Sequence, residues 1–344
     1  MPTLFHVCEL CVMTTGRYRA GVAPEDTGVP KAALAPSDET FKALLNHGGH
    51  PEAEVEKNPC RLRLMAVHAH PDDESSKGAG TMARYVDEGA EVTVVTCTGG
   101  ERGDILNPRL KDDPEANADL SAVRHREMDR AREILGINQV WLGYVDSGLP
   151  EGDPLPALPD GCFALIDPEE AARPLVKLVR ELRPHVMLTY DENGGYPHPD
   201  HIHSHRISML AYELAADPSY MPELGEPWAV AKIYYQLLFP PAQMIAYARY
   251  MREHGLDNPF EAQMEYFEGL DQRPITTRVN VSRYLDVRDA ALLAHATQVD
   301  PDGFFFAVSN EIKREAWPTE DFQLRHSRIG VTLPESDLFE GIRQ

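Results

Sequence analysis

The stretch LRLMAVHAHPDD, residues 62–73, carries several potential metal or proton ligands directly after an apolar run. The apolar part predicts a buried strand over residues 62–68, and His70, Asp72 and Asp73 follow at its carboxyl end. Open α/β sheets bind their ligands outside the carboxyl ends of their strands. The stretch therefore predicts an α/β fold and also the edge of the sheet that carries a functional site.

A second patch of the same kind occurs further along the chain. The segment YPHPDH, residues 196–201, comes soon after the apolar run at 186–190. Catalytic zinc commonly takes three ligands from His, Asp and Glu and leaves one position for water. His70, Asp73 and His201 form such a set, and Fe²⁺ would accept the same ligands. The two patches together predict a mononuclear Zn²⁺ site suited to hydrolysis.

The other polar residues of the two patches suit proton transfer. Asp72 remains beside the predicted ligands, where a free carboxylate is well placed as general base. His198 lies three residues before His201 and is expected to stabilise an oxyanion or to protonate a leaving amine. Asp200 could orient the His198 imidazole, and Tyr196 could donate to the same oxyanion.

Simpler interpretations exist for each patch. A lone His-Pro-Asp is usually a turn, in which Asp73 or Ser75 could cap the helix that follows. His201 and His205 are four residues apart, the spacing of two metal ligands on one helical face. We rank this pair second, because it leaves the first patch without a purpose. His68 is interpreted as a buried structural histidine.

The composition is that of an acidic globular protein. The 344 residues carry a formal net charge of −22, which argues against nucleic acid as a partner because phosphate binding needs clustered Lys and Arg. No apolar stretch approaches the ~20 residues of a membrane span. The five cysteines are scattered, which argues against a disulfide framework and favours a cytoplasmic location. Neither nucleic acid nor a membrane is therefore expected as a partner.

The chain divides into an extension at 1–60, expected to be poorly ordered, and a domain at 61–344 with a helical C-terminal part. Alternating strands and helices in this domain predict a Rossmann-like, mostly parallel sheet with helices on both faces. Strands are expected at 62–68, 91–97, 139–142, 186–190, 232–238 and 276–281. Helices are expected at 77–88, 120–135, 169–182, 201–215, 243–252, 261–269 and 282–297. The long loops at 98–118 and 145–168 are candidates for building the site.

These motifs resemble the LmbE-like (PIG-L) family of zinc-dependent N-deacetylases. The resemblance rests on AHPDDE at 69–74, TGGE at 98–101 and HPDH at 198–201, and it covers roughly residues 61–300. It implies an LmbE-like α/β fold and hydrolysis of amides on amino sugars. It also implies zinc at the three predicted ligands. In the same way it implies Asp72 as the general base, His198 as the partner of the oxyanion and the leaving group, and Tyr196 as a tyrosine that helps to polarise the carbonyl.

The resemblance extends to the substrate. Glu101 and Arg124 match positions that bind a glucosamine–inositol moiety, and Asp146 and His295 complete the expected substrate-binding set. Segments 68–78, 96–103 and 295–301 resemble the mycothiol S-conjugate amidases within the family. Those amidases carry a lysine at the position of Lys77, which is expected to contact the acyl or conjugate part of the substrate.

The resemblance therefore implies hydrolysis of a thiol–sugar conjugate. The amide would join an S-substituted N-acetylcysteine to glucosaminyl-inositol, and its cleavage would release a mercapturic acid for detoxification. Deacetylation of N-acetylglucosaminyl-inositol by the same catalytic residues is the alternative. A non-catalytic sugar-binding or metal-storage protein is a third interpretation, which the presence of both Asp72 and His198 argues against.

Overall fold

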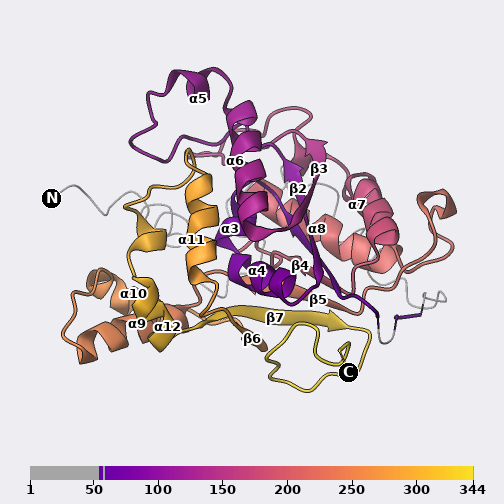
Figure 1. Cartoon of the computed structure of the whole chain (residues 1–344). Coiled ribbons are helices and arrows are strands. Elements are labelled where there is room, and N and C mark those ends of the chain that lie inside the picture. The colour runs from indigo at the N-terminus through magenta and orange to yellow at the C-terminus, as the bar shows by residue number, and fades with distance from the viewer. Residues whose placement is uncertain (1–53, 57–58, 344) are drawn as a thin grey trace.

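The fold is built on one seven-stranded sheet, seen in a computed structural model that describes residues 54–56 and 59–343 (Figure 1). The strand order is β3-β2-β1-β4-β5-β7-β6. The strands are β1 (Arg63–His68), β2 (Glu91–Thr98), β3 (Asn138–Tyr144), β4 (Val186–Thr189), β5 (Lys232–Leu237), β6 (Thr277–Asn280) and β7 (Thr319–Ser327). The five strands from β3 to β5 pair in parallel, which confirms the predicted α/β class.

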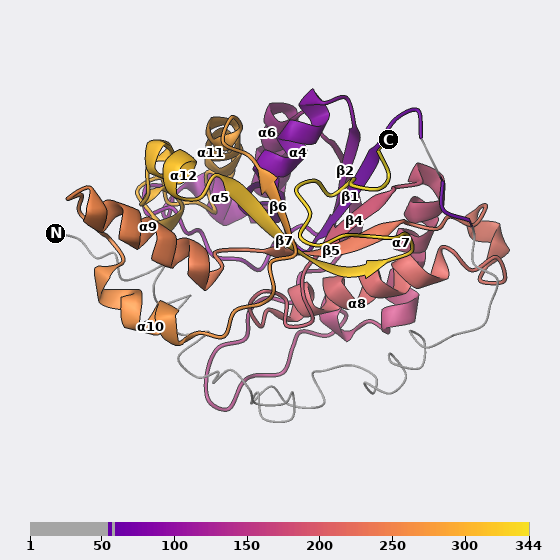
Figure 2. The ribbon, with the colours of Figure 1, turned by 90° about the horizontal axis from the view of Figure 1, so that it is seen from below.

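Helices cover both faces of this sheet (Figure 2). One face carries α4 (Ala79–Asp87), α6 (Leu120–Leu135) and α11 (Leu285–Ala294), and the other carries α7 (Pro168–Leu182) and α8 (Pro199–Leu214). Successive strand residues point to opposite faces. Accordingly, Leu64 and Ala66 of β1 lie in the first core, and Met65 and Val67 lie in the second. This double burial explains why the strand sequences are continuously apolar.

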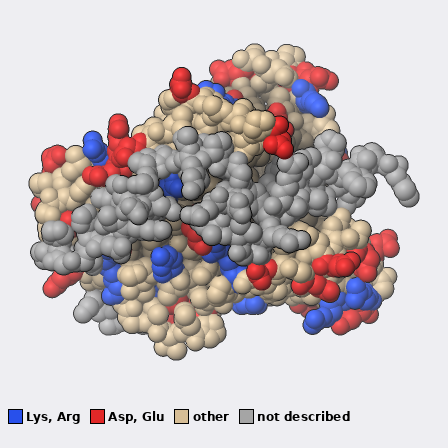
Figure 3. Space-filling view, turned by 180° about the vertical axis from the view of Figure 1, so that it is seen from behind, with Lys and Arg blue, Asp and Glu red and all other residues tan. Residues whose placement is uncertain are grey.

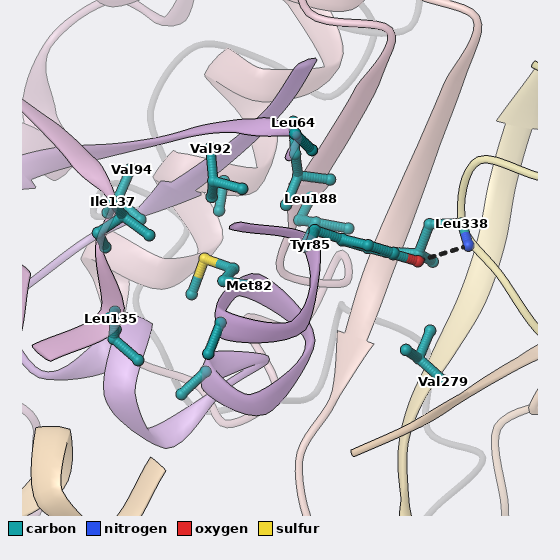
Figure 4. Close-up of a cluster of buried hydrophobic side chains, with 14 of the residues drawn as sticks. Leu64, Met82, Tyr85, Val92, Val94, Leu135, Ile137, Leu188, Val279 and Leu338 are labelled. Carbon is teal, nitrogen blue, oxygen red and sulfur yellow. Dashed lines mark hydrogen bonds between the residues drawn. The ribbon is translucent and has the colours of Figure 1, made fainter. Parts of the chain in front are cut away.

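The C-terminal tail closes the first core (Figure 4). Tyr85 of α4 lies flat among the buried side chains, and its hydroxyl accepts a hydrogen bond from the Leu338 N–H at 2.9 Å. At the start of β5, the buried ammonium of Lys232 pairs with the carboxylate of Glu335. The second oxygen of that carboxylate accepts a hydrogen bond from the Tyr234 hydroxyl at 2.7 Å. The last residues are therefore part of the domain rather than an appendage.

Helices near the C-terminus build a smaller apolar cluster of their own. They are α9 (Pro241–Glu253), α10 (Met264–Gly269) and α12 (Asn310–Ala316), with 3₁₀ turns at Glu261–Gln263 and Phe304–Phe306. The remaining short elements are α3 (Asp73–Ser76), α5 (Pro114–Ala118) and 3₁₀ turns at Phe163–Leu165 and Pro222–Leu224. The predicted helical C-terminal part is thus present, and Figures 1 and 2 both place it at one end of the sheet.

The structure differs from the sequence-based elements in several places, and the short helices α3, α5 and α12 were not predicted. Strand β7 was not predicted, and it runs antiparallel between β5 and β6. The helix predicted from residue 77 begins at Ala79, because Gly78 adopts φ 78° and separates α3 from α4. Its N-cap is therefore Gly78 rather than Asp73 or Ser75. The helix predicted at 282–297 is shorter, Leu285–Ala294.

Most of the predicted extension, residues 1–60, lies outside the residues that the structure describes. Within residues 54–56 and 59–343, no helix is long and apolar enough to cross a membrane. Where atoms of described residues are visible on the face seen from behind, acidic and basic side chains lie interspersed (Figure 3).

Candidate metal centre

The two sequence patches meet at one edge of the sheet. Strands β1 and β4 are parallel neighbours, with Ala66 opposite Leu188, so their carboxyl ends lie side by side. The first patch follows β1, and the second leads into α8. The chain order of the strands reverses between β1 and β4, and such a switch point is where open α/β sheets bind ligands.

Asp73 lies close to both of the predicted histidine ligands. Asp73 Oδ2 lies 3.7 Å from His70 Nδ1 and 3.6 Å from His201 Nε2. All three side chains are buried. The rings of His70 and His201 are 5.3 Å apart between centroids. Two imidazoles and a carboxylate facing one another at these distances match the His-Asp-His donor set of a catalytic zinc site.

His201 gives an independent test of whether a cation fits. Its Nδ1 lies 2.9 Å from the Gly194 carbonyl, which fixes the proton on Nδ1 and leaves Nε2 as an acceptor. Nε2 is fully buried and has no hydrogen-bond partner among the residues that the structure describes. A buried acceptor without a partner is costly. A metal ion on Nε2 would satisfy it, so the donor set fits a metal.

The close approach of Gly194 also requires a glycine. Its φ is 76°, and a Cβ built there would lie 2.7 Å from the His201 Cβ. Any other residue would therefore push the His201 ring away from its position.

Other side chains could share a cation at the same place. Two sets of buried groups have ligand atoms within 4.8 Å of one another: His70, His198 and His201, and His70, Asp146, His198 and Asp200. Asp73 belongs to neither set, and its oxygens pair with Tyr190 and Lys77. We keep Asp73 rather than His198 as the proposed third ligand, because His198 Nδ1 accepts the Asp200 N–H at 3.1 Å, which places the ring proton on Nε2. Neither set combines His201 with His205, whose Nδ1 lies 3.1 Å from the Tyr190 carbonyl.

Asp200 contacts two histidines of the centre. Its backbone N–H donates to His198 Nδ1 and so holds that imidazole, as the sequence suggested for this residue. Its side chain faces the other way, with Oδ2 3.2 Å from His70 Nε2, a contact that was not expected. Asp200 is held in turn by the Ser147 N–H at 2.9 Å and by the Ser147 hydroxyl. Asp146 Oδ1 lies 3.6 Å from the same His70 nitrogen.

These carboxylates favour positive charge at His70. Although burial opposes it, Asp146, Asp200 and Asp73 raise the pKa of His70 to about 10. Burial would also raise the pKa of Asp73, but Lys77, His201 and His70 lower it well below its usual value. Asp73 is therefore a carboxylate at neutral pH, and together with Asp146, whose pKa is also lowered, it places negative charge beside His70.

Asp72 stands next to this centre in an unusual backbone conformation. Its φ is 121°, a region that L-residues rarely adopt, and such strain persists only where the surroundings enforce it. Glu74 Oε2 accepts the Asp72 N–H at 3.0 Å, and Arg124 Nη2 donates to Asp72 Oδ2 at 3.2 Å. The Asp72 side chain is 26% exposed, while the side chain of Asp73 is only 4% exposed. The two aspartates thus occupy different environments, as their predicted roles require.

The pKa values near Asp72 are consistent with that division. Burial raises the pKa of Asp72, although Arg124 opposes the shift. Burial, reinforced by His70 and His201, holds the pKa of His198 well below its usual value. Burial also raises the pKa of Tyr196 well above its usual value. At neutral pH, His198 is therefore uncharged and the Tyr196 hydroxyl keeps its proton.

The residues expected to bind substrate are mostly engaged with the protein. Arg124 is buried and donates to the Gly100 and Pro71 carbonyls, both at 2.7 Å. Glu101 accepts the Asp146 N–H at 2.8 Å, and Asp146 accepts the Arg102 N–H at 3.0 Å. These contacts join the loops after β1, β2 and β3 around the centre.

Lys77 and His295 are both buried, and each contacts a carboxylate of the segment that follows β1. The Lys77 ammonium pairs with Asp73 Oδ1, and its side chain is 7% exposed. His295 is fully buried, and its Nε2 lies 2.6 Å from Glu74 Oε1. His295 thus contacts Glu74, the residue that also holds the Asp72 N–H. The geometry places His295 behind Asp72 rather than at an open surface.

Sequence reasoning missed two residues of this centre. Tyr190 donates its hydroxyl to Asp73 Oδ2 at 2.5 Å and accepts the Ala69 N–H at 2.7 Å. Glu74 forms the pair with His295 and shapes the turn at Asp72. Glu74 could have been found as the last residue of the AHPDDE motif. No local signal marks Tyr190, because its partners lie more than a hundred residues away.

Comparisons with known proteins agree with this geometry. Residues 65–212 match the family model described as PIG-L, GlcNAc-PI de-N-acetylase. A mycothiol S-conjugate amidase of Streptomyces coelicolor is 54% identical to the chain, over 82% of this chain and 98% of the relative. A 1D-myo-inositol 2-acetamido-2-deoxy-alpha-D-glucopyranoside deacetylase of Streptomyces avermitilis is 42% identical, over 81% of this chain and 97% of the relative.

A solved structure confirms the fold. The N,N'-diacetylchitobiose deacetylase of Pyrococcus horikoshii superposes with a TM-score of 0.54 at 18% identity, over 84% of this chain and 92% of that one. The family model spans both strand-tip patches, and the similarity to the amidase extends over nearly its whole length. The chain therefore belongs to the PIG-L family of de-N-acetylases.

Proposed function

We propose that this chain is a Zn²⁺-dependent amidase that acts on mycothiol S-conjugates. It would cleave the amide between an S-substituted N-acetylcysteine and glucosaminyl-inositol, and release a mercapturic acid. The single observation that carries the proposal is the 54% identity to a mycothiol S-conjugate amidase over 98% of that protein. A cytoplasmic location belongs to the same proposal, supported by the free thiols of Cys97 and Cys162 in the described part of the chain.

The chemistry begins at the proposed ligands. His70, Asp73 and His201 would hold the metal, which when bound supplies Lewis-acid polarisation of a carbonyl and an acidified water. Asp72 lies next to Asp73 without belonging to the ligand set and accepts the proton of the attacking water. Burial raises the pKa of Asp72, and a base with a pKa closer to neutrality accepts a proton more readily. Arg124, 3.2 Å from Asp72 Oδ2, holds the carboxylate in place.

His198 and Tyr196 are the proposed hydrogen-bond donors to the oxyanion, and the tautomer of His198 supports its part. Since His198 Nδ1 accepts a backbone N–H, the neutral ring carries its proton on Nε2 and can donate it. The Tyr196 ring lies 4.6 Å from His201 and 6.1 Å from His198 between centroids, so its hydroxyl belongs to the same space. These two donors stabilise the negative oxygen that develops as the carbonyl is attacked. A proton relayed to the amide nitrogen then lets the amine leave.

The alternative substrate is the acetylated sugar. Relatives at 41–43% identity are named as deacetylases of an inositol glucosaminide, and the proposed catalytic residues would serve that reaction equally. The test is a direct comparison of kcat/KM for the Zn²⁺-loaded protein on an S-bimane conjugate and on N-acetylglucosaminyl-inositol. We expect the conjugate to be cleaved with the higher kcat/KM. A higher value on the acetylated sugar would assign the chain to the deacetylases instead.

A further inference from the structure

An aromatic pocket adjoins the candidate metal centre on the side of Lys77. Its cavity volume is ≈ 80 Å³, and it is partly open to solvent. Aromatic side chains line it, among them Phe239, Tyr247, Phe260, Phe304, Phe305 and Trp317. An aromatic lining of this kind is typical of sites for small apolar groups.

The inner wall of the pocket is the turn that carries the metal centre. Ser76, Lys77 and Gly78 line it, and the Lys77 ammonium contacts Asp73. Gln236 fixes this wall from the sheet, because its amide donates to the Lys77 carbonyl at 2.8 Å. The pocket therefore begins one helical turn, about 5 Å, from a proposed metal ligand.

The polar groups of the lining are already paired within the protein. Glu320 accepts the Gly80 and Thr81 N–H groups at 2.9 and 2.8 Å. Asp321 accepts the Trp317 indole N–H at 2.7 Å. Lys313 donates to the Phe305 carbonyl at 3.2 Å. These three polar side chains are thus engaged within the protein, and the aromatic side chains beside them offer surface for an apolar group to contact.

The aromatic wall of the pocket lies beyond the segment that the family model matches. That model covers residues 65–212, which hold all three proposed metal ligands and the Ser76–Gly78 wall, whereas every aromatic residue of the pocket lies beyond residue 212. The catalytic centre and the aromatic wall thus come from different parts of the chain. Such an arrangement suits a pocket that selects among substrates of one reaction type.

We propose that this pocket binds the apolar group attached to the cysteine sulfur of the conjugate, an inference that rests on the function proposed above. In such a substrate the sulfur is three bonds from the scissile carbonyl carbon, a reach of about 4–5 Å. That reach matches the single turn between Asp73 and Lys77. With the carbonyl at the metal centre, the sulfur stands at Lys77 and its substituent enters the aromatic pocket.

The test compares two conjugates of the same thiol–sugar, one S-methyl and one S-benzyl, by kcat/KM. We expect the wild type to favour the benzyl conjugate by about 10- to 100-fold, the range for burying a phenylalanine-sized group. Phe305→Ala should lower kcat/KM about tenfold for S-benzyl and leave S-methyl within about twofold. Leu238→Trp, which fills the pocket, should have the same selective effect.

The matched control is Phe306→Ala. Phe306 belongs to the same 3₁₀ turn as Phe305 but does not line the pocket, so both conjugates should keep their wild-type kcat/KM. An equal loss on the two conjugates in Phe305→Ala, or a wild type that does not discriminate between them, would overturn the proposal.

A binding measurement separates this proposal from the proposed function. N-acetyl-S-benzylcysteine is titrated into the zinc-loaded protein while the fluorescence of Trp317, which lines the pocket, is followed. Quenching that Phe305→Ala abolishes supports the pocket even if neither conjugate is hydrolysed, and in that case only the proposed function fails. Absence of Phe305-dependent binding overturns the pocket itself.

Discussion

At the scale of single residues, the metal centre depends on side chains behind the proposed ligands. Asp200 contacts His70 Nε2 at 3.2 Å and is itself anchored by Ser147, so it sets the orientation of the ring and leaves Nδ1 toward Asp73. Partners of this kind contribute strongly to metal affinity, because they fix both the tautomer and the direction of the ligand atom.

Asp200→Asn is therefore expected to weaken Zn²⁺ affinity by about 10- to 100-fold while the fold persists. Competition with a chromogenic chelator measures the affinity directly. Asp167→Asn is the control, because Asp167 caps α7 and contacts no proposed ligand. An unchanged Zn²⁺ affinity in Asp200→Asn would show that His70 does not bind metal in this orientation.

Residue types and spacing led to the proposed ligands and base, but they did not predict the side chains that hydrogen-bond to the motif residues. The two patches carry the His and Asp side chains in order, so their meeting followed once the strands were recognised. The contacts of Tyr190 with Asp73, and of His295 with Glu74, join residues 117 and 221 positions apart. No periodicity in one sequence encodes such partners.

At the scale of elements, helix α4 is capped by a distant strand. Its own N-cap, Gly78, has no side chain to offer, and the carboxylate of Glu320 in β7 instead accepts the Gly80 and Thr81 N–H groups. This contact fixes the start of α4 directly after the turn that carries Lys77. It also explains why local sequence misplaced the start of the helix.

Glu320→Ala is expected to lower the free energy of unfolding by about 1–2 kcal/mol, because it removes both capping acceptors and a negative charge at the helix N-terminus. Urea denaturation followed by circular dichroism measures the change. Glu315→Ala, on the exposed side of α12, is the matched control and should stay within about 0.5 kcal/mol of wild type. Equal effects of the two substitutions would refute the capping role.

Strand β7 was missed for a related reason. Its sequence, TEDFQLRHS, is largely polar because only Asp321 and Phe322 are buried. The parallel strands could be recognised because both of their faces are covered by helices and their sequences are continuously apolar. An antiparallel strand near the edge of the sheet leaves no comparable run.

At the scale of the whole molecule, acid stability depends on a buried histidine in α8. Both ring nitrogens of His203 lack a hydrogen-bond partner among the described residues, and the ring packs edge-on against Phe163 at 4.6 Å. Burial lowers the pKa of His203 from 6.5 to about 3. The unfolded chain therefore binds a proton at pH values where the folded chain does not, so stability is lost as the pH falls below 6.5.

Replacing His203 with an apolar residue should remove this loss of stability at low pH. Relative to wild type, His203→Leu is expected to gain about 2 kcal/mol of unfolding free energy between pH 7 and pH 5. Denaturant titrations at a series of pH values measure the difference. A difference between the two proteins that does not change with pH would contradict the assignment.

The whole chain combines a shared catalytic core with a C-terminal part that shapes the pocket. Composition and alternation of strands and helices predicted the class of fold, and the motifs predicted the family. The packing of α9, α10 and α12 could not be predicted, because their cluster forms only when segments between Phe239 and Trp317 assemble against the sheet edge.

The most direct test of the account is the activity and metal content of Asp72→Asn. We expect about one Zn²⁺ per chain, as in the wild type, with kcat for the S-conjugate lowered about 10²- to 10⁴-fold, because the base is lost and the ligands are kept. Elemental analysis and initial rates on the same preparation give both quantities. Turnover within a few-fold of wild type, with zinc bound, would contradict the central claim.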